Sequence, residues 1–284
     1  MLRPPHSRYH RLFVYHLDRR DIKPFDDADL IGVWLEDEAA ILFFHRDRTE
    51  LVNDICRINK TRVTYRADLD YRDWEAGVKI RSFTTSRLRI SPVWDYSPRR
   101  RDDRSHILLD PSVIFGSGFH ASTRLCLEAL EQLASQTPSA LKSVLDLGTG
   151  TGLLAIAAVT LGAGGVTALD NNPLSCAVAR RNVELNRCGD KIRVREQDLD
   201  TEPPDSRCSL VIANLYKNLL LRLFERESFW QAAYYIISGF LPAMEAELLA
   251  ALPPGVRMLA RHSRDTWRLW ILATAGGPEK KTDR

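Results

Sequence analysis

The chain has 284 residues, of which 44% are hydrophobic, 27% charged and 8% aromatic. This is the composition of a globular protein with a packed core, and it excludes a wholly disordered, collagenous or coiled-coil chain. The net charge of +3, from 40 basic and 37 acidic side chains, predicts no broad nucleic-acid-binding surface. A local patch remains compatible with this balance. Arg99–Arg101 offer one, but Asp102 and Asp103 follow directly and favour a solvated linker.

The cysteines, histidines and apolar runs predict a cytoplasmic protein without metal or membrane segments. Five cysteines without a C-x-x-C pair argue against a disulfide framework and fit reduced thiols. The start MLRPPHSRYHRLF lacks the apolar region of a secretory signal, and the histidines have no metal-site spacing. The uncharged run 147–169 is long enough to span a bilayer. Its glycines, with an aspartate at each end, favour a strand, turn, helix and strand instead.

Residues 1–70 predict a small α+β domain. The strand-like segments are RLFVYHL, IGVWL, AAILFF and TRVTYR. Thr49 is a candidate cap for a helix that runs to Asn59, because the apolar residues between them fall on one helical face. The order of these segments indicates a sheet with one helix.

Residues 71–104 predict a connector, in which Trp74 and Trp94 are candidates to pack on a domain face. From 105 to 275 the pattern alternates between helix and strand, which is typical of a parallel sheet with helices on both faces. Two closing strand-like segments, RMLARHSRD and WRLWILA, predict an antiparallel hairpin at the edge of that sheet. Residues 276–284 are a polar tail.

The segment 143–170, SVLDLGTGTGLLAIAAVTLGAGGVTALD, carries the first chemical signal. A buried strand ends at Asp146 and Leu147, and Gly148, Gly150 and Gly152 then turn the chain into a helix. Glycines suit this turn because they tolerate positive φ and let a ligand approach the backbone. The second strand ends at Asp170, whose carboxylate can accept hydrogen bonds from both hydroxyls of a ribose.

The spacing is G-x-G-x-G, whereas the dinucleotide fingerprint is G-x-G-x-x-G. With Asp146 ahead of it, the run resembles the first motif of class I S-adenosylmethionine-dependent methyltransferases. That resemblance implies that S-adenosyl-L-methionine is the cofactor, with the loop holding its methionine part and Asp170 its ribose. A structural turn without a ligand is the competing interpretation, and the position of Asp170 favours the cofactor site.

A second segment, 109–127, reads LDPSVIFGSGFHASTRLCL. Taken alone, Ser122 or Thr123 could cap the following helix, and His120 could be an ordinary loop residue. The segment resembles the D-P-G-x-A-F-G-T-G-x-H-x-T-T signature of the ribosomal protein L11 methyltransferase family. Seven positions match: Asp110, Pro111, Phe115, Gly116, Gly118, His120 and Thr123. The segments DWEAG, ISPVW, SGFLPAMEAEL and TWRLW extend the resemblance through nearly the whole chain.

This resemblance implies a Rossmann-like class I methyltransferase sheet with an antiparallel C-terminal hairpin, plus a small N-terminal α+β domain for substrate recognition. It assigns cofactor contacts to Thr123, Gly148, Asp170 and Asn214. We add Phe115, Gly118, His120 and Gly150 from the same two motifs. Asp198 lies where class I enzymes often contact adenine, although a plain strand-end acid is an equal interpretation. Asn214 and Tyr216 are the candidates nearest the acceptor.

The activity implied is methyl transfer to lysine or N-terminal amino groups of a protein, specifically a large-subunit ribosomal protein. Two departures concern the target. The 13 residues between Leu17 and Ile31 leave little room for the first helix of the family's recognition domain, and Asn214-Leu215-Tyr216-Lys217 lacks the residues usual after the family's asparagine. The alternatives are a methyltransferase acting on RNA or DNA bases, a nicotinamide oxidoreductase, and a catalytically silent cofactor-binding scaffold.

Overall fold

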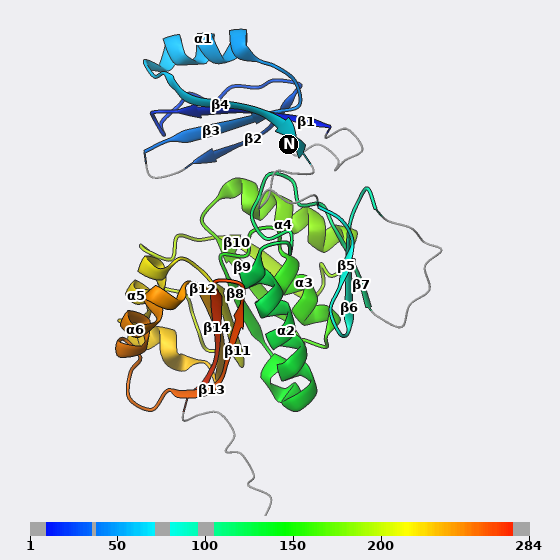
Figure 1. Cartoon of the computed structure of the whole chain (residues 1–284), viewed down its shortest axis with the longest axis vertical. Coiled ribbons are helices and arrows are strands. Elements are labelled where there is room, and N and C mark those ends of the chain that lie inside the picture. The colour runs from blue at the N-terminus through cyan, green and yellow to red at the C-terminus, as the bar shows by residue number, and fades with distance from the viewer. Residues whose placement is uncertain (1–9, 36–37, 72–79, 96–104, 275–284) are drawn as a thin grey trace, which may run out of the picture.

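The computed structural model of the chain describes residues 10–35, 38–71, 80–95 and 105–274. These residues form a four-stranded, a seven-stranded and a three-stranded sheet. In Figure 1 the four-stranded sheet and its helix α1 sit above the large α/β unit, with α4 closest to them. Trp74, the cluster Arg99–Arg101 and the tail 276–284, all singled out in the sequence, lie outside the described residues.

The N-terminal sheet is antiparallel, in the order β2-β3-β1-β4. Its elements are β1 (Arg11–Leu17), β2 (Leu30–Leu35), β3 (Ala40–Phe44), α1 (Thr49–Asn59) and β4 (Val63–Asp70). The four strand-like segments predicted for this region are all present. As the short spacing predicts, residues 18–29 between β1 and β2 contain no helix.

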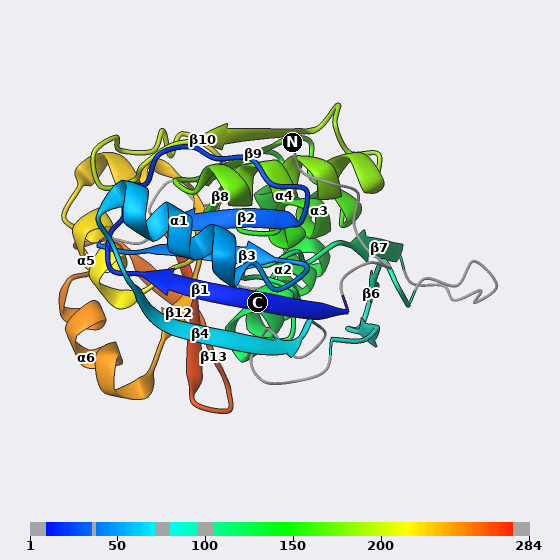
Figure 2. The same cartoon turned by 90° about the horizontal axis from the view of Figure 1, so that it is seen from above.

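Successive side chains of a strand point to opposite sides of its sheet. Apolar side chains are buried on both faces of this one. Tyr15, Leu42 and Phe44 pack under α1. On the opposite face, Val14 and Phe43 belong to a cluster that includes residues of the large unit. The small sheet is therefore sandwiched between its own helix and the large unit, an arrangement that Figure 2 shows from above.

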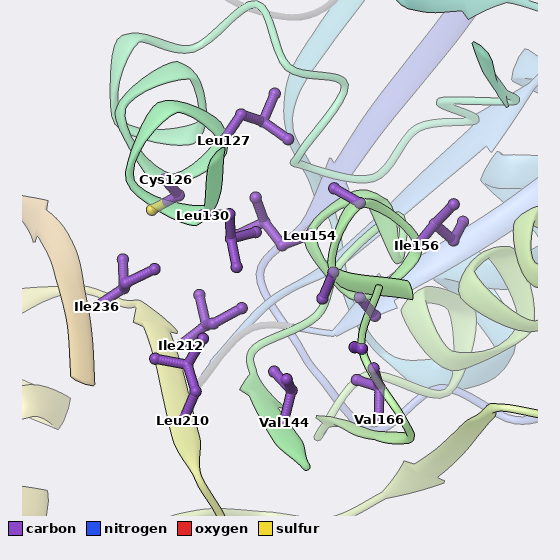
Figure 3. Packing of buried hydrophobic residues seen from close by; sticks show 14 of the residues in the cluster. Cys126, Leu127, Leu130, Val144, Leu154, Ile156, Val166, Leu210, Ile212 and Ile236 are labelled. Carbon is purple, nitrogen blue, oxygen red and sulfur yellow. The ribbon is translucent and has the colours of Figure 1, made fainter. Parts of the chain in front are cut away.

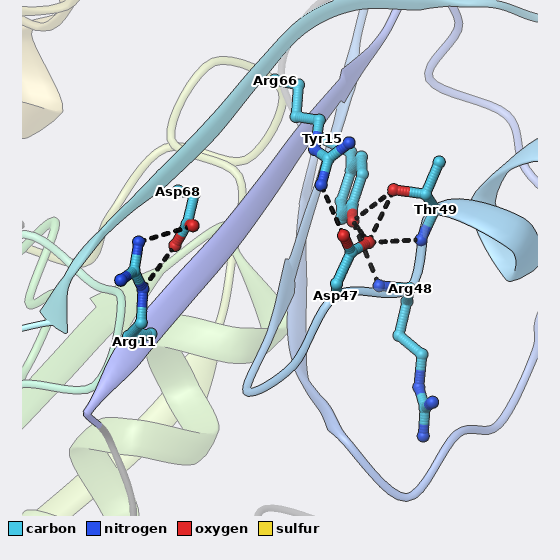
Figure 4. Close-up of polar contacts among 7 residues, drawn as sticks. All are labelled: Arg11, Tyr15, Asp47, Arg48, Thr49, Arg66 and Asp68. Atoms are coloured by element: carbon cyan, nitrogen blue, oxygen red, sulfur yellow. Dashed lines mark hydrogen bonds and ion pairs between the residues drawn. The ribbon is translucent and has the colours of Figure 1, made fainter.

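The start of α1 differs from the prediction. Arg48, not Thr49, is the N-cap residue, and it makes no side-chain capping bond. The carboxylate of Asp47 instead accepts hydrogen bonds from the Thr49 amide (2.9 Å) and hydroxyl (2.6 Å). It also accepts one from the Tyr15 hydroxyl at 2.8 Å, which joins the helix start to β1 (Figure 4). These bonds hold the pKa of Asp47 below its usual range, with the Thr49 hydroxyl as the largest cause.

The seven-stranded sheet has the order β10-β9-β8-β11-β12-β14-β13. The first five strands in this order, from the edge strand β10 across to β12, run parallel. The last two, β14 and β13, add the antiparallel hairpin predicted from the sequence. The strands are β8 (Val144–Leu147), β9 (Val166–Asp170), β10 (Ile192–Glu196), β11 (Leu210–Asn214), β12 (Tyr234–Phe240), β13 (Arg257–Arg264) and β14 (Trp267–Ala273). The mostly parallel α/β fold is confirmed.

Helices cover this sheet on both faces. They are α2 (Ala121–Gln136), η2 (Pro138–Leu141), α3 (Leu153–Thr160), α4 (Pro173–Leu185), α5 (Lys217–Phe224), η3 (Glu227–Gln231) and α6 (Pro242–Ala250). The small third sheet, β5 (Phe83–Thr84), β6 (Leu88–Pro92) and β7 (Ser105–Leu109), leads into the large unit. Figure 3 shows Leu130 of α2 and Leu154 of α3 facing Val144, Val166 and Ile212 of the sheet.

The uncharged run 147–169 forms the end of β8, the glycine turn, α3 and most of β9, as the sequence predicts. None of the helices in the described part of the chain combines the length and apolar character that crossing a membrane requires. Residues 197–209 connect the parallel strands β10 and β11 through turns and irregular chain without a helix.

Candidate cofactor-binding site

A cavity of about 380 Å³ opens at the carboxyl ends of the parallel strands. In parallel α/β sheets this edge is where ligands bind. The wall draws on β8, β9, β11 and β12, on the start of β14 and on β2 of the N-terminal sheet. Its residues are Trp34, Ile114, Phe115, His120, Ser122, Gly148, Gly150, Asp170, Asn171, Asn172, Ser175, Gln197, Asp198, Leu199, Asp200, Asn214, Leu215, Tyr216, Leu219, Gly239 and Trp267.

Asp170 is positioned by two backbone amides. One carboxylate oxygen accepts a hydrogen bond from Gly150 N at 2.9 Å, and the other accepts one from Asn172 N at 3.0 Å. Burial raises the pKa of Asp170, although both amide bonds oppose that shift. Each oxygen of an ionised carboxylate has a second lone pair to offer. The carboxylate is therefore held in place and still able to accept two hydroxyl hydrogen bonds from the cavity.

The glycine turn after β8 has a backbone that other residues adopt only with strain. Gly148, Gly150 and Gly152 have φ of 67°, 53° and 82°, in the left-handed region that favours glycine. A Cβ on Gly150 would lie 2.4 Å from the carbonyl oxygen of Phe115. The close approach is consolidated by a hydrogen bond from Thr151 N to that same oxygen, at 3.2 Å. The two motifs singled out in the sequence thus pack directly against each other.

Asp146, at the end of β8, lies behind the cavity and not in its wall. It accepts a hydrogen bond of 2.6 Å from the hydroxyl of Thr149, which ties the glycine turn to the strand. Burial raises the pKa of Asp146 to about 6, and the nearby Asp170 adds to the shift. The residue supports the turn without facing the ligand space.

His120 is the N-cap of α2, and neither Ser122 nor Thr123 has that role. Its Nδ1 lies 2.7 Å from Ser122 Oγ and 3.4 Å from Ser122 N. The ring also packs edge-on against Trp267, with centroids 4.4 Å apart. Burial lowers the pKa of His120, so the neutral imidazole is favoured. His120 therefore shapes the cavity wall and holds the start of α2.

The predicted acceptor-side residues meet at the end of β11. Asn214 Nδ2 donates a long hydrogen bond of 3.5 Å to Thr123 Oγ1. Tyr216 follows, with its ring 57% exposed, and its hydroxyl accepts a hydrogen bond from Arg222 at 3.2 Å. Phe115 is 40% exposed on the cavity wall. Two aromatic rings thus combine cavity-wall positions with exposure to solvent.

The cavity wall includes eight of the ten predicted site residues: Phe115, His120, Gly148, Gly150, Asp170, Asp198, Asn214 and Tyr216. Thr123 lies behind Asn214, to which it is hydrogen-bonded. Gly118 is buried with φ of 88°, and a Cβ there would lie 2.5 Å from the Phe83 ring. Gly118 therefore serves packing between the loop and the small third sheet and does not line the cavity.

Several wall residues were not identified from the sequence. Asn171, Asn172 and Ser175 directly follow Asp170, so their position after a ribose-type acid could have suggested them. Trp34 and Trp267 come from the two ends of the chain, and no local signal marks them. The Nδ2 group of Asn172 is buried and has no hydrogen-bond partner among the described residues. An unpaired donor next to Asp170 fits a ligand with oxygen or nitrogen acceptors.

Comparisons with known proteins identify the family. Residues 20–274 match the family model of ribosomal protein L11 methyltransferase (PrmA). A ribosomal protein L11 methyltransferase of Carboxydothermus hydrogenoformans is 33% identical over 213 residues, which are 73% of this chain and 68% of the relative. The protein of the same name from Chloroflexus aurantiacus is 37% identical over 208 residues, 64% of this chain and 62% of the relative.

A solved structure gives the same result for the fold. The ribosomal protein L11 methylase of Lactobacillus delbrueckii subsp. bulgaricus superposes with a TM-score of 0.59 and 28% identity. The superposition covers 68% of this chain and 98% of that chain.

Proposed function

This chain belongs to the ribosomal protein L11 methyltransferase family, and we propose that it transfers methyl groups to lysine or N-terminal amino groups of a large-subunit ribosomal protein, in the cytoplasm. The observation that carries the proposal is the fixed carboxylate of Asp170 beside the positive-φ glycine turn. S-adenosyl-L-methionine, when bound, supplies a methyl group activated on its sulfonium.

In this proposal Asp170 holds the ribose hydroxyls, and the backbone of Gly148 and Gly150 accommodates the methionine part of the donor. The buried amide of Asn172 lies next to Asp170, in the same wall, and offers a further donor group. Phe115, His120 and Trp267 form an aromatic part of the wall. Asp198 is exposed, its carboxylate accepts a hydrogen bond from the amide of Asp200 at 2.9 Å, and we assign it to the adenine end.

The acceptor amine has to lose a proton before it can attack. At pH 7 this costs roughly 4.6 kcal/mol for a lysine of ordinary pKa and about 1–1.4 kcal/mol for an α-amino group. Removing water from around the amine lowers both costs, because burial disfavours the charged form. Phe115 and Tyr216 can exclude water there, and Asn214 can orient the amine through its side-chain oxygen. Positioning and desolvation therefore carry catalysis in this proposal.

We assign substrate recognition to the N-terminal unit, residues 1–70, and methyl transfer to residues 105–275, joined by the connector 71–104. Trp34 of β2 lines the cavity although it belongs to the N-terminal sheet. The absence of a helix in residues 18–29 changes the recognition unit relative to the family pattern. The contact surface for the acceptor is therefore the part of this protein where we expect the largest difference from its relatives.

The test is methyl transfer from labelled S-adenosylmethionine to large-subunit ribosomal fractions that contain both protein and RNA, combined with calorimetry of S-adenosylhomocysteine. We expect the wild-type protein to label a ribosomal protein on an amino group. Asp170→Ala should abolish both donor binding and labelling, because the ribose loses its main acceptor. Asp198→Ala is the matched control, another acid of the same wall, and should weaken binding less.

Unchanged donor affinity in Asp170→Ala would overturn the assignment of the site. Labelling that disappears after ribonuclease treatment of the acceptor fraction would point to a nucleic-acid base as the acceptor. Donor binding without labelling of any fraction would leave a cofactor-binding scaffold.

A further inference from the structure

Among the described residues, no helix covers one face of the large sheet beside its edge strand β10. The helices with the main contacts to β10 are α3 and α4, and both lie on the face occupied by Val166, Ala168 and Ile192. On the other face, α5 and α6 cover the neighbouring strands β8, β11, β12 and β14. The helix-free connection 197–209 leaves the β9–β10 part of that second face open.

Arginine side chains occupy this open face in a regular arrangement. Paired residues on neighbouring strands share a face. Arg193 is in register with Thr167 and, through it, with Leu145 of the second face, while Arg195 is in register with Leu169. Both arginines are exposed. They therefore project from the uncovered face beside buried leucines.

A groove of about 660 Å³ runs along these strands and their amino-terminal ends. Its cations are Lys142, Lys191, Arg193, Arg195 and Arg207, and its acids are Asp190 and Asp205. Arg207 forms an ion pair with Asp205, in which its Nε and Nη2 each donate a hydrogen bond of 2.8 Å to a carboxylate oxygen. The other four cations are exposed and have no ion pair in the described part of the chain. An excess of unpaired positive charge is thus concentrated here, although the whole chain is nearly neutral.

The groove borders the cofactor-binding cavity at one residue. Gln197, directly after β10, lines both hollows. A polyanion lying in the groove would therefore reach Gln197, next to Asp198 at the adenine end of the cavity.

We propose that this groove binds the phosphate backbone of double-helical RNA, next to the ribosomal protein that accepts the methyl group. Exposed arginines and lysines together with Ser143 and Thr167 are the side-chain types that contact phosphates and sugars. The described residues that line the groove include no aromatic side chain on which an unpaired base could stack. A duplex backbone fits this chemistry better than single-stranded RNA. The choice of RNA rests on the proposed ribosomal acceptor, whereas the charge argument does not.

The test is fluorescence anisotropy with a labelled RNA duplex of ~16 base pairs, long enough to present two successive minor grooves. It uses the full chain without donor or acceptor protein. We expect binding that weakens with salt, because neutralised phosphates release counterions. Arg193→Gln/Arg195→Gln should lower the affinity on the order of tenfold and reduce the salt slope by about two, one for each lost phosphate contact.

The matched control is Arg257→Gln/Arg261→Gln. These arginines are exposed on β13, the other edge strand of the same sheet, and the double change removes the same charge. We expect the control to bind RNA like the wild type. The proposal would be overturned if the two double variants lost RNA affinity equally. It would also be overturned if poly-glutamate displaced the duplex more strongly than unlabelled RNA does. Because Asp170→Ala should retain RNA binding, failure of the groove and failure of the methyl-transfer site are distinguishable.

Discussion

Asp146 and Asp170 end neighbouring strands, and burial raises the pKa of both carboxyl groups. Their surroundings give them different roles. Asp146 is fully enclosed and holds the glycine turn through Thr149. Asp170 is only partly buried and faces the cavity with amide bonds to both oxygens. One acid therefore maintains the local backbone while the other is available to a ligand.

The raised pKa of Asp146 predicts a pH-dependent stability. Its carboxyl has an ordinary value of 3.8 and a native value of about 6. Between these values the native state holds the proton longer than the unfolded chain, so the free energy of unfolding falls as the pH rises through this window. Asp146→Asn keeps an acceptor oxygen for Thr149 and removes the titration. Relative to wild type, the variant should gain about 2 kcal/mol between pH 4 and pH 7.

Denaturant unfolding at both pH values measures this difference. An identical stability gap between variant and wild type at pH 4 and at pH 7 would contradict the native pKa given to Asp146.

The residues that the sequence identified are those whose chemistry is local. Gly148, Gly150 and Asp170 belong to one strand–turn–helix–strand unit, so their spacing alone predicts that they meet. Trp34 and Trp267 reach the same cavity through long-range packing, which a short window of sequence does not predict. The capping role of His120 was missed because serine and threonine are the commoner caps, whereas here Ser122 is the partner of the imidazole.

At the scale of elements, a bulge in β12 shapes the acceptor side of the cavity. The pairing of β12 with β14 shifts register between Ser238 and Phe240. Gly239 occupies the bulge with φ of 95°, and a Cβ there would lie 2.2 Å from the carbonyl oxygen of Leu215. The position of Tyr216, which directly follows Leu215, therefore depends on the absence of a side chain at position 239.

Gly239→Ala should consequently displace the Leu215–Tyr216 segment and weaken binding of S-adenosylhomocysteine. The matched control is Gly255→Ala, since Gly255 has φ of 89° and nothing within 4 Å of its would-be Cβ. Both variants should lose about 1–2 kcal/mol of stability from left-handed backbone strain. Only Gly239→Ala should also lose affinity in calorimetry. Equal affinity in both variants would show that the bulge does not control the cavity.

Element types followed the sequence closely because hydrophobic periodicity is strong in this chain. The strands RLFVYHL and VTALD became β1 and β9 with the same residues. The connection 197–209 could not be assigned in this way, because DLDTEPPDSRCS contains no periodic pattern and its course depends on packing. Its lack of a helix is nevertheless what opens the groove beside β10.

At the scale of the whole molecule, an apolar cluster joins the N-terminal sheet to the large unit. Val113 and Leu174 of the large unit join Val14 and Phe43 in a single cluster. The Tyr71 hydroxyl adds a buried hydrogen bond to the carbonyl of Ser112. Because the 112–123 loop also reaches the cavity, the position of the N-terminal sheet and the shape of the cofactor site are physically connected.

Trp34→Ala tests this connection. Removing the ring opens the cavity wall from the side of the N-terminal sheet, so donor affinity should fall on the order of tenfold, about 1.4 kcal/mol. Trp94→Ala is the control, because Trp94 packs on the same cluster without lining the cavity. Its affinity for S-adenosylhomocysteine should stay near the wild-type value even if thermal stability drops. Unchanged affinity for S-adenosylhomocysteine in Trp34→Ala would show that the N-terminal sheet does not influence the cofactor site.

The position of β14 has a consequence for synthesis. This strand lies between β12 and β13 in the sheet, although it follows both along the chain, and Trp267 at its start packs on His120. A nascent polypeptide that has emerged only to residue 250 exposes the backbone of β12 as an open edge. The catalytic unit therefore reaches its finished form only when its last strand has left the ribosome, whose proteins include the proposed acceptor.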